Sequence, residues 1–124
     1  MTISEALTKI DELKPNGYSQ NDKVSWLSTL DGMVFRQIFD THEDSSIESF
    51  AGYNEFTSLS TELLITDPYA EECYMTWLEA KIDSANNEYT KYNNSIIRFT
   101  DAYRDFANDY NRHHIPKGKK IRYF

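Results

Sequence analysis

Residues 77–110 read WLEAKIDSANNEYTKYNNSIIRFTDAYRDFANDY, and this stretch decides the fold of the chain. Its apolar and aromatic residues recur at alternating spacings of three and four, which is the period of an amphipathic helix. The stripe consists of Leu78, Ile82, Ala85, Tyr89, Tyr92, Ile96, Phe99, Tyr103, Phe106 and Tyr110. A helix of this length cannot bury such a stripe against itself, so we expect it to pack on other helices of this chain or of a neighbouring one.

The composition indicates one mainly helical domain. The chain has 124 residues, with only 4 Gly and 3 Pro but 9 Tyr, 7 Phe and 2 Trp, and this length suffices for a modest core. We therefore expect an all-α helical bundle. It would have two N-terminal helices, a long irregular loop, a long C-terminal helix that is continuous or kinked, and an extended C-terminal tail. Residues 1–111 would form the helical domain and residues 112–124 an extended basic arm.

Two helices are predicted within the first forty residues. Thr2 and Glu5 have the spacing of a capping box, in which each side chain satisfies a backbone N–H of the other residue. Residues 14–17 (KPNG) end this helix, because Pro cannot continue it and Asn-Gly readily adopts positive φ. The second helix is expected to begin near Ser19 and to run to about Asp40. Its apolar residues cover more than half of the circumference, which indicates burial on two sides.

Residues 41–66 show no sustained period and are expected to form a long loop. A connection of this length in a small domain is usually functional or disordered, and its scattered aromatic residues favour an ordered loop with a short strand at 62–66. Asp67 and Pro68 then suit the N-cap and the first position of the long helix, which would run to about Arg112. Two Asn pairs, at 86–87 and 93–94, weaken that helix. A break near residue 93 and a continuous helix both remain open.

Charge is polarised along the chain. Residues 1–111 hold all 20 acidic residues and 8 of the 13 Lys and Arg residues, a net charge of −12, whereas residues 112–124 hold the other 5 and no acid, a net charge of +5. The acidic body repels nucleic acid through its net field. The basic tail can meet either phosphate groups or an acidic groove on a protein.

The tail combines cations with large apolar residues, and we expect it to be a docking arm. The arm residues are Arg112, Lys117, Lys119, Lys120, Ile121, Arg122, Tyr123 and Phe124. A tail that only aids solubility does not need three large apolar residues among its last four. We therefore favour docking to a protein over binding to nucleic acid or an idle disordered tail, which remain the alternatives.

The sequence gives little sign of catalysis or of metal binding. His113 and His114 are adjacent, so on a helix they face different directions, and His42 and Cys73 have no partner at the spacing of metal ligands. We expect surface histidines, a small apolar role for Cys73, no catalytic residues, no metal and no cofactor. A single cysteine also excludes an internal disulfide. With no signal-like N-terminus and no long apolar run, we expect a soluble protein without a membrane partner.

Three acids recur every four residues near the end of the long helix: Asp101, Asp105 and Asp109. They lie on one helix face, where like charges at this spacing cost a few tenths of a kcal/mol per pair. A solvated surface explains this row most simply. The sharper hypothesis is a face kept anionic, such as the lining of a channel through which DNA slides without sticking.

Several stretches of the chain resemble the head-to-tail connector (adaptor) proteins of tailed bacteriophages. These stretches are residues 61–69 (TELLITDPY), 74–83 (YMTWLEAKID) and 88–94 (EYTKYNN). The helix-turn-helix block of residues 3–30, with Ala6, Lys23, Trp26 and Leu27, also fits. The resemblance covers most of the chain and rests on apolar spacing rather than on catalytic residues.

The resemblance implies a structural virion protein of the neck, between capsid and tail. Such proteins are helical and form a ring, typically of twelve copies, beneath the portal protein. The ring lengthens the channel for passing double-stranded DNA without sequence-specific binding and offers a platform for the next neck or tail component. The C-terminal arm commonly reaches the portal, and assembly takes place in the host cytoplasm. Two other classes stay open: a small nucleic-acid-binding protein and a small regulatory helical protein of a phage operon.

Overall fold

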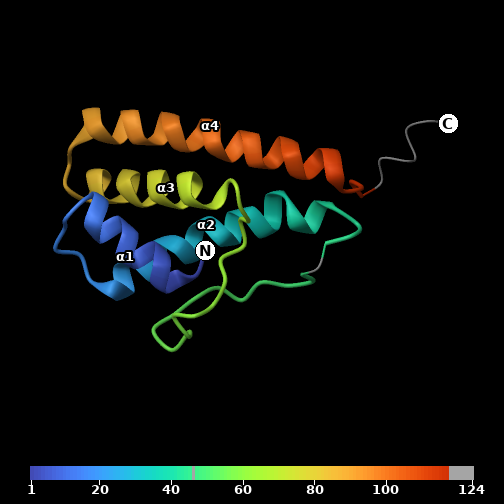
Figure 1. Cartoon of the computed structure of the whole chain (residues 1–124), viewed down its shortest axis with the longest axis horizontal. Helices are drawn as coiled ribbons and strands as arrows, with labels where there is room; N and C mark the ends of the chain where they lie inside the picture. The colour runs from blue at the N-terminus through green and yellow to red at the C-terminus, as the bar shows by residue number, and fades with distance from the viewer. Residues whose placement is uncertain (46, 118–124) are drawn as a thin grey trace.

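The computed structural model describes residues 1–45 and 47–117, and the fold is an all-α helical bundle, as expected from the sequence (Figure 1). Its elements are α1 (Ile3–Leu13), α2 (Gln20–Gln37), the short 3-10 helix η1 (Phe39–Thr41), α3 (Ala70–Ala85) and α4 (Tyr89–His113). Within these described ranges there is no strand, and the extended pairings are two isolated β-bridges.

The N-terminal helices begin where the sequence predicts. The Thr2 side chain accepts from the backbone N–H of Glu5, and the Glu5 side chain accepts from the backbone N–H of Thr2, which completes the capping box. Ser19 caps α2 by accepting from the backbone N–H of Asp22. The second helix reaches Gln37, and η1 carries the chain on to Thr41, in agreement with a predicted end near residue 40.

The long C-terminal helix of the sequence prediction is two helices joined in a hairpin. The break lies at residues 86–88, between α3 and α4, and not near residue 93. Asn87 adopts a φ of 60°, a left-handed conformation that Asn tolerates better than most residues. In Figure 1, α4 runs back along the whole of α3 and extends beyond its start. The break allows the two halves of the stripe to pack on each other. The expected single long helix is therefore wrong, but the expected packing on other helices of the chain is confirmed, since α3 also packs on α1 and α2.

A buried carboxylate at the end of α3 favours this position for the break. Asp83 is fully buried, lies 2.6 Å from the Lys14 Nζ and accepts a hydrogen bond of 3.1 Å from the Ser95 hydroxyl. These contacts fix the first turns of α4 against α3 and against the end of α1. Asn93 and Asn94 are exposed on α4, where they cost helix propensity only.

Lysine–carboxylate pairs attach α1 to the helices around it. Lys23 of α2 is buried, and its Nζ lies 2.6 Å from an Asp11 carboxylate oxygen. Lys9 reaches Glu71 of α3 at 2.7 Å, where both partners are exposed. The buried Lys23 position depends on its partner, because an ammonium taken out of water without one is costly.

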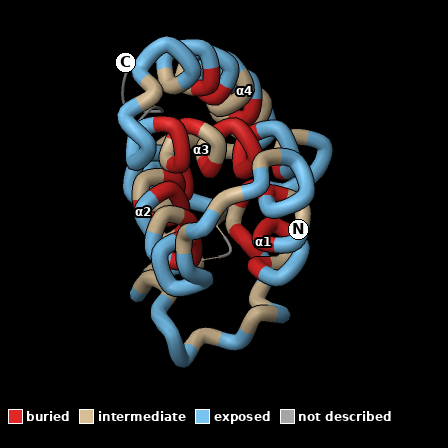
Figure 2. The backbone as a smooth tube through the Cα atoms, turned by 90° about the vertical axis from the view of Figure 1, so that its left-hand side faces the viewer, coloured by how far each residue is buried: buried red, intermediate tan, exposed pale blue. Residues whose placement is uncertain are grey.

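The core surrounds α3. Figure 2 shows buried positions on α3 facing both α4 and the pair α1 and α2. The largest fully buried apolar and aromatic side chains come from α1, α2, α3 and the segment before α3: Tyr74, Ile3, Ile10, Leu27, Leu30, Ile65, Leu78, Ile82 and Val34. Helix α4 contributes Phe99 and Phe106, while Tyr89 at its start is 66% exposed. The stripe is therefore buried at Leu78, Ile82, Phe99 and Phe106. The middle of the stripe, at Tyr89, is exposed.

The loop between η1 and α3 is ordered by hydrogen bonds to the helices, as its aromatic content predicts. Its later part pairs with the N-terminus through Ile3 N–H to Thr61 O (3.0 Å) and Leu63 N–H to Met1 O (2.9 Å). The predicted strand at 62–66 is reduced to a single bridge between Thr2 and Glu62. Helix α3 begins at Ala70 after the N-cap Tyr69, two residues later than predicted.

The loop is held most firmly by Asp31, a fully buried acid in the middle of α2. Its carboxylate accepts from the hydroxyls of Tyr53 and Tyr74, each at 2.5 Å, and from the backbone N–H of Leu64 at 3.0 Å. The Tyr74 hydroxyl in turn accepts from the backbone N–H of Ile65 at 2.8 Å. Burial raises the pKa of Asp31, and the three hydrogen bonds that favour its charged form oppose that rise.

We expect Tyr74→Phe to destabilise the fold more than Tyr53→Phe. Loss of the Tyr74 hydroxyl removes a partner from Asp31 and from the Ile65 N–H inside the core, which costs roughly 1–3 kcal/mol. Tyr53 is only partly buried and makes one of these bonds. Chemical denaturation of both variants measures the order; equal free energies of unfolding would contradict it.

The Tyr74→Phe cost is also expected to grow with pH. Burial raises the folded-state pKa of Asp31, so ionisation of this carboxyl opposes folding, and stability is lost as pH rises through that pKa. Without the Tyr74 hydroxyl the pKa rises further, since a bond to the charged form is gone. Unfolding curves below and above the titration compare the two proteins; a pH-independent difference would show that Asp31 is not involved.

Phe99→Ala should cost about 3–5 kcal/mol, because it empties a buried site between α4 and α3. Phe99 is 5% exposed, and its ring centroid lies 5.1 Å from that of Trp77. Ile97→Ala is the matched control, since Ile97 lies two residues away and is 60% exposed. Thermal unfolding should separate the two variants clearly. Similar melting temperatures would mean that Phe99 does not pack in the core.

Candidate functional site

The described part of the predicted arm is fixed to the end of the bundle. Helix α4 ends at His113, and His114 is already extended. Two backbone hydrogen bonds then join the chain to the end of η1, from Glu43 N–H to Ile115 O (2.9 Å) and from Lys117 N–H to Thr41 O (2.8 Å). They flank an antiparallel bridge between His42 and Pro116. The chain thus leaves α4 before Pro116, and the residues on either side of Pro116 hold it against the end of η1.

His42 is the centre of this attachment. It is 3% exposed, with Nδ1 at 2.5 Å from Ile38 O and Nε2 at 2.8 Å from the Asn111 side-chain oxygen. The ring of His42 meets the ring of Tyr110 edge-on at 4.8 Å, and Tyr110 stacks on His114 at 3.6 Å. His42 thus joins α2, η1 and α4, and the prediction of a surface histidine is wrong here.

The other predicted histidines and the cysteine have simpler surroundings. The side chain of His113 is 65% exposed and points to Asp109, with its Nδ1 at 2.8 Å from the Asp109 carbonyl. Cys73 lies buried in the first turns of α3, as expected, and burial raises the pKa of its thiol to about 12. Among residues 1–45 and 47–117, no group of three or more His, Cys, Asp or Glu side chains is placed to hold a metal ion.

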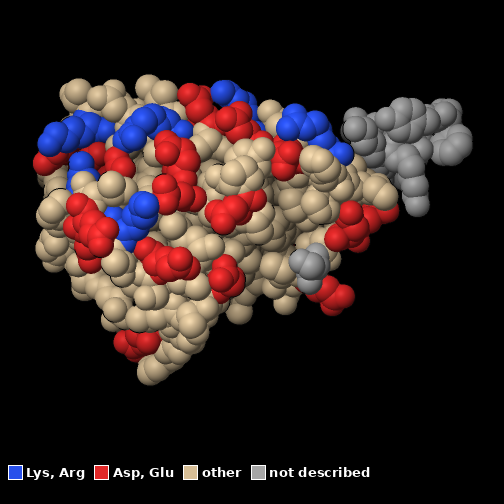
Figure 3. Space-filling view, in the orientation of Figure 1, with Lys and Arg blue, Asp and Glu red and all other residues tan. Residues whose placement is uncertain are grey.

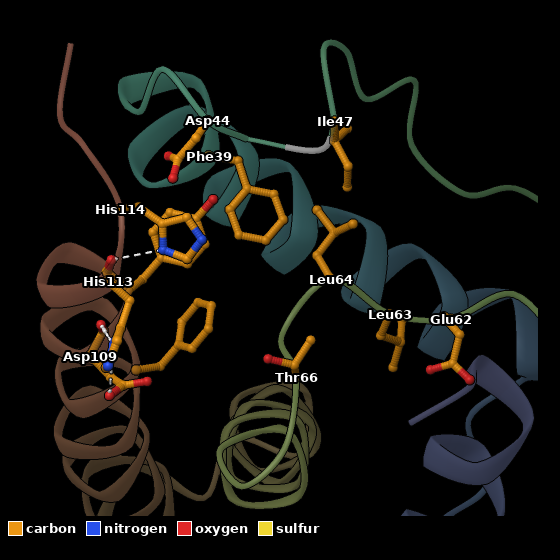
Figure 4. A pocket seen from close by; sticks show the side chains of 12 residues that line it. Phe39, Asp44, Ile47, Glu62, Leu63, Leu64, Thr66, Asp109, His113 and His114 are labelled. Carbon is orange, nitrogen blue, oxygen red and sulfur yellow. Dashed lines mark hydrogen bonds and ion pairs between the residues drawn. The ribbon is translucent and has the colours of Figure 1, made fainter.

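A groove of about 690 Å³ opens beside this attachment, between the end of α4 and the segment that leads into α3 (Figure 4). Figure 4 shows Phe39 reaching in between Leu64 on one side and the His113–His114 turn on the other. Apolar groups form much of its wall, and acidic side chains stand among them. The lining residues are Phe39, Asp44, Ile47, Glu62, Leu63, Leu64, Thr66, Phe106, Asp109, Tyr110, His113 and His114.

The predicted row of acids on α4 is only partly free. Asp101 pairs with Arg104 at 2.8 Å, and Asp109 lies 3.5 Å from Arg112. Asp109 also lines the groove, while Asp101 and Asp105 line a shallower hollow of about 300 Å³ beside the start of α3. Figure 3 shows cations and acids interleaved over this side of the molecule. The acids therefore belong to a surface of mixed charge, and their exposure to a DNA channel stays a prediction.

The residues of the predicted arm fall into two sets. Arg112 and Lys117 lie at the end of α4 and at the bridge, where Lys117 Nζ is 3.7 Å from an Asp40 carboxylate oxygen. The remaining arm residues lie outside the described residues: Lys119, Lys120, Ile121, Arg122, Tyr123 and Phe124.

Neither the groove nor the Asp31 cluster is predicted by the sequence patterns described above. The groove is lined by residues of η1, the loop and α4. These residues are up to about seventy positions apart, so no local sequence pattern predicts the groove. Asp31 did leave a signal, because it stands between Leu27 and Val34 on the apolar side of α2. An acid at such a position requires hydrogen-bond partners when it is buried.

Comparison with known proteins adds no relative to this description. The chain matches no protein-family model, no curated protein and no solved structure. Any functional assignment therefore rests on the residues of the chain itself. Of the helices described, none is long and apolar enough to cross a lipid bilayer.

His42→Ala is expected to loosen the attachment of residues 114–117 while leaving the core helices folded. The substitution removes the contacts to Ile38, Asn111 and Tyr110. Limited trypsin digestion should then cut after Arg112 several-fold faster, since cleavage follows local opening. Asn108→Ala, at an exposed position on α4 that leaves the cleaved bond unchanged, is the control and should be cut like the wild type. Equal rates for both variants would show that His42 does not hold the attachment.

Proposed function

We propose that this chain is a structural protein of the neck of a tailed bacteriophage, a head-to-tail adaptor that forms a ring under the portal. The observation that carries the proposal is the fixed origin of a basic, apolar-rich tail at one end of a small helical bundle. A tail held by backbone pairing starts at the same point in every copy. Such an arrangement suits a protein that joins other components, and it supports the resemblance seen in the sequence.

The charge of the chain supports a role beside passing DNA. Residues 1–111 carry a net charge of −12, which disfavours adhesion of a polyanion to the ring. Asp101, Asp105 and Asp109 lie along α4 and are the acids we assign to the channel side. The ring, with twelve copies as the resemblance implies, would extend the DNA channel and bind a tail or neck completion protein on its other face.

The alternative of a small nucleic-acid-binding or regulatory protein has less support. A phosphate-binding surface needs cations that are free to replace counterions. Arg98, Arg104 and Arg112 on α4 are each paired with a carboxylate, at 2.6, 2.8 and 3.5 Å. These three arginines would have to leave their carboxylates to bind phosphate.

Truncation after Asn111 tests both the proposed adaptor function and the proposed role of residues 112–124 as its docking arm. We expect far-ultraviolet circular dichroism to stay nearly unchanged, because only the last two residues of α4 lie beyond the cut, while incorporation into virions is lost. Antibody labelling of particles from wild-type phage should place the chain at the head–tail junction. Truncation after Lys117 is the control that keeps the bridge to His42. Absence of the wild-type chain from virions would refute the function, and normal incorporation of both truncated chains would refute the arm.

A further inference from the structure

The groove beside the arm attachment has the chemistry of a docking site for a cationic, apolar peptide. Phe39, Leu63 and Phe106 are almost completely buried and form its apolar base. The acidic residues Asp44 and Asp109 stand at its margin, where Asp109 also lies 3.5 Å from Arg112. An apolar base with an anionic margin selects a partner that brings both large apolar anchors and cations.

The C-terminal segment of the same chain has this composition. Residues 118–124 read GKKIRYF, with three cations, three large apolar residues and no acid. Fully extended, seven residues reach about 23–25 Å from the last described position, Lys117. This reach allows the segment to pass from its own bundle onto an adjoining one.

We propose that residues 118–124 of one copy bind in the groove of a neighbouring copy. This inference rests on the proposed function of residues 112–124 as a docking arm and names the partner of that arm. The resemblance to connector proteins places such arms on the portal. The matching composition of groove and tail makes a second copy of the chain the partner.

The direction of the chain at the bridge favours the groove of a neighbouring copy over the groove of the same copy. Pairing is antiparallel, with Ile115 opposite Glu43 and Lys117 opposite Thr41. From Ile115 to Lys117 the chain therefore runs toward Asp40 and away from Asp44 on the groove margin. We take this direction, away from Asp44, as favouring the groove of an adjoining copy over the groove of the same copy.

The arm and the groove are different surfaces, so this contact is head-to-tail. A head-to-tail contact repeats from copy to copy and closes into a ring when the rotation between copies allows it. The arm would thus link each subunit to the next around the ring, in addition to whatever holds the ring on the portal.

A charge exchange between two full-length variants tests the proposal. The tail variant carries Lys119→Glu, Lys120→Glu and Arg122→Glu, and the groove variant carries Asp44→Lys and Asp109→Lys. We expect sedimentation velocity to show concentration-dependent association of the wild type and a dissociation constant at least tenfold higher for each variant alone. Mixing the two variants should restore association, because the acidic tail of one then meets the basic groove of the other.

The control variant, Glu12→Lys with Glu55→Lys, makes the same charge change at exposed positions outside the groove and should associate like the wild type. Ile121→Ser with Tyr123→Ser and Phe124→Ser removes the apolar anchors without touching the core and should also abolish association. A wild type that stays monomeric, variants that associate normally, or a mixture that stays dissociated would each overturn the proposal. These outcomes are independent of whether the protein occurs in virions, so they separate this inference from the proposed function.

Discussion

The buried carboxylate of Asp31 is the interaction on which the rest of the structure depends. A long loop with little periodic structure would otherwise gain too few contacts to offset its conformational entropy. The hydrogen bonds of Asp31 with Tyr53, Tyr74 and Leu64 bring this loop, α2 and α3 to one point. Because the low-dielectric interior penalises any unpaired partner, the cluster specifies one arrangement rather than several. Leu63 and Leu64, which line the groove, are placed by that arrangement.

A second buried carboxylate, Asp83, has the same role at the opposite end of α3. It connects the end of α1, through Lys14, with the early part of α4, through Ser95. The two acids thus fix α3 at its two ends, and the apolar stripe fills the space between α3 and α4. The two buried acids and the apolar stripe together keep α4 in one register on α3, although many residues of α4 are polar and exposed.

Local signals predict most of the helices. The position of the break between α3 and α4, the burial of His42 and the groove depend on nonlocal contacts. Thr2 and Ser19 mark helix starts by hydrogen bonds within a few residues, so the sequence alone suffices for them. The two Asn pairs have equal propensities, and the choice between them depends on a contact of Asp83 with a residue twelve positions away. His42 and the groove depend on contacts between residues up to about seventy positions apart, which no periodicity reports. The arm residues are predicted from composition alone, because charge and apolar content can be read without the fold, and their role stays a prediction.

The position of Pro116 in its bridge has a consequence for the evolution of the arm. Proline lacks an N–H, and here the two hydrogen bonds are made by the backbone of its neighbours, Ile115 and Lys117. Because the pairing uses main-chain atoms, side chains at these positions can vary without moving the point where the arm begins. Related chains could therefore exchange partners by changing the tail sequence alone, while the helical bundle stays the same.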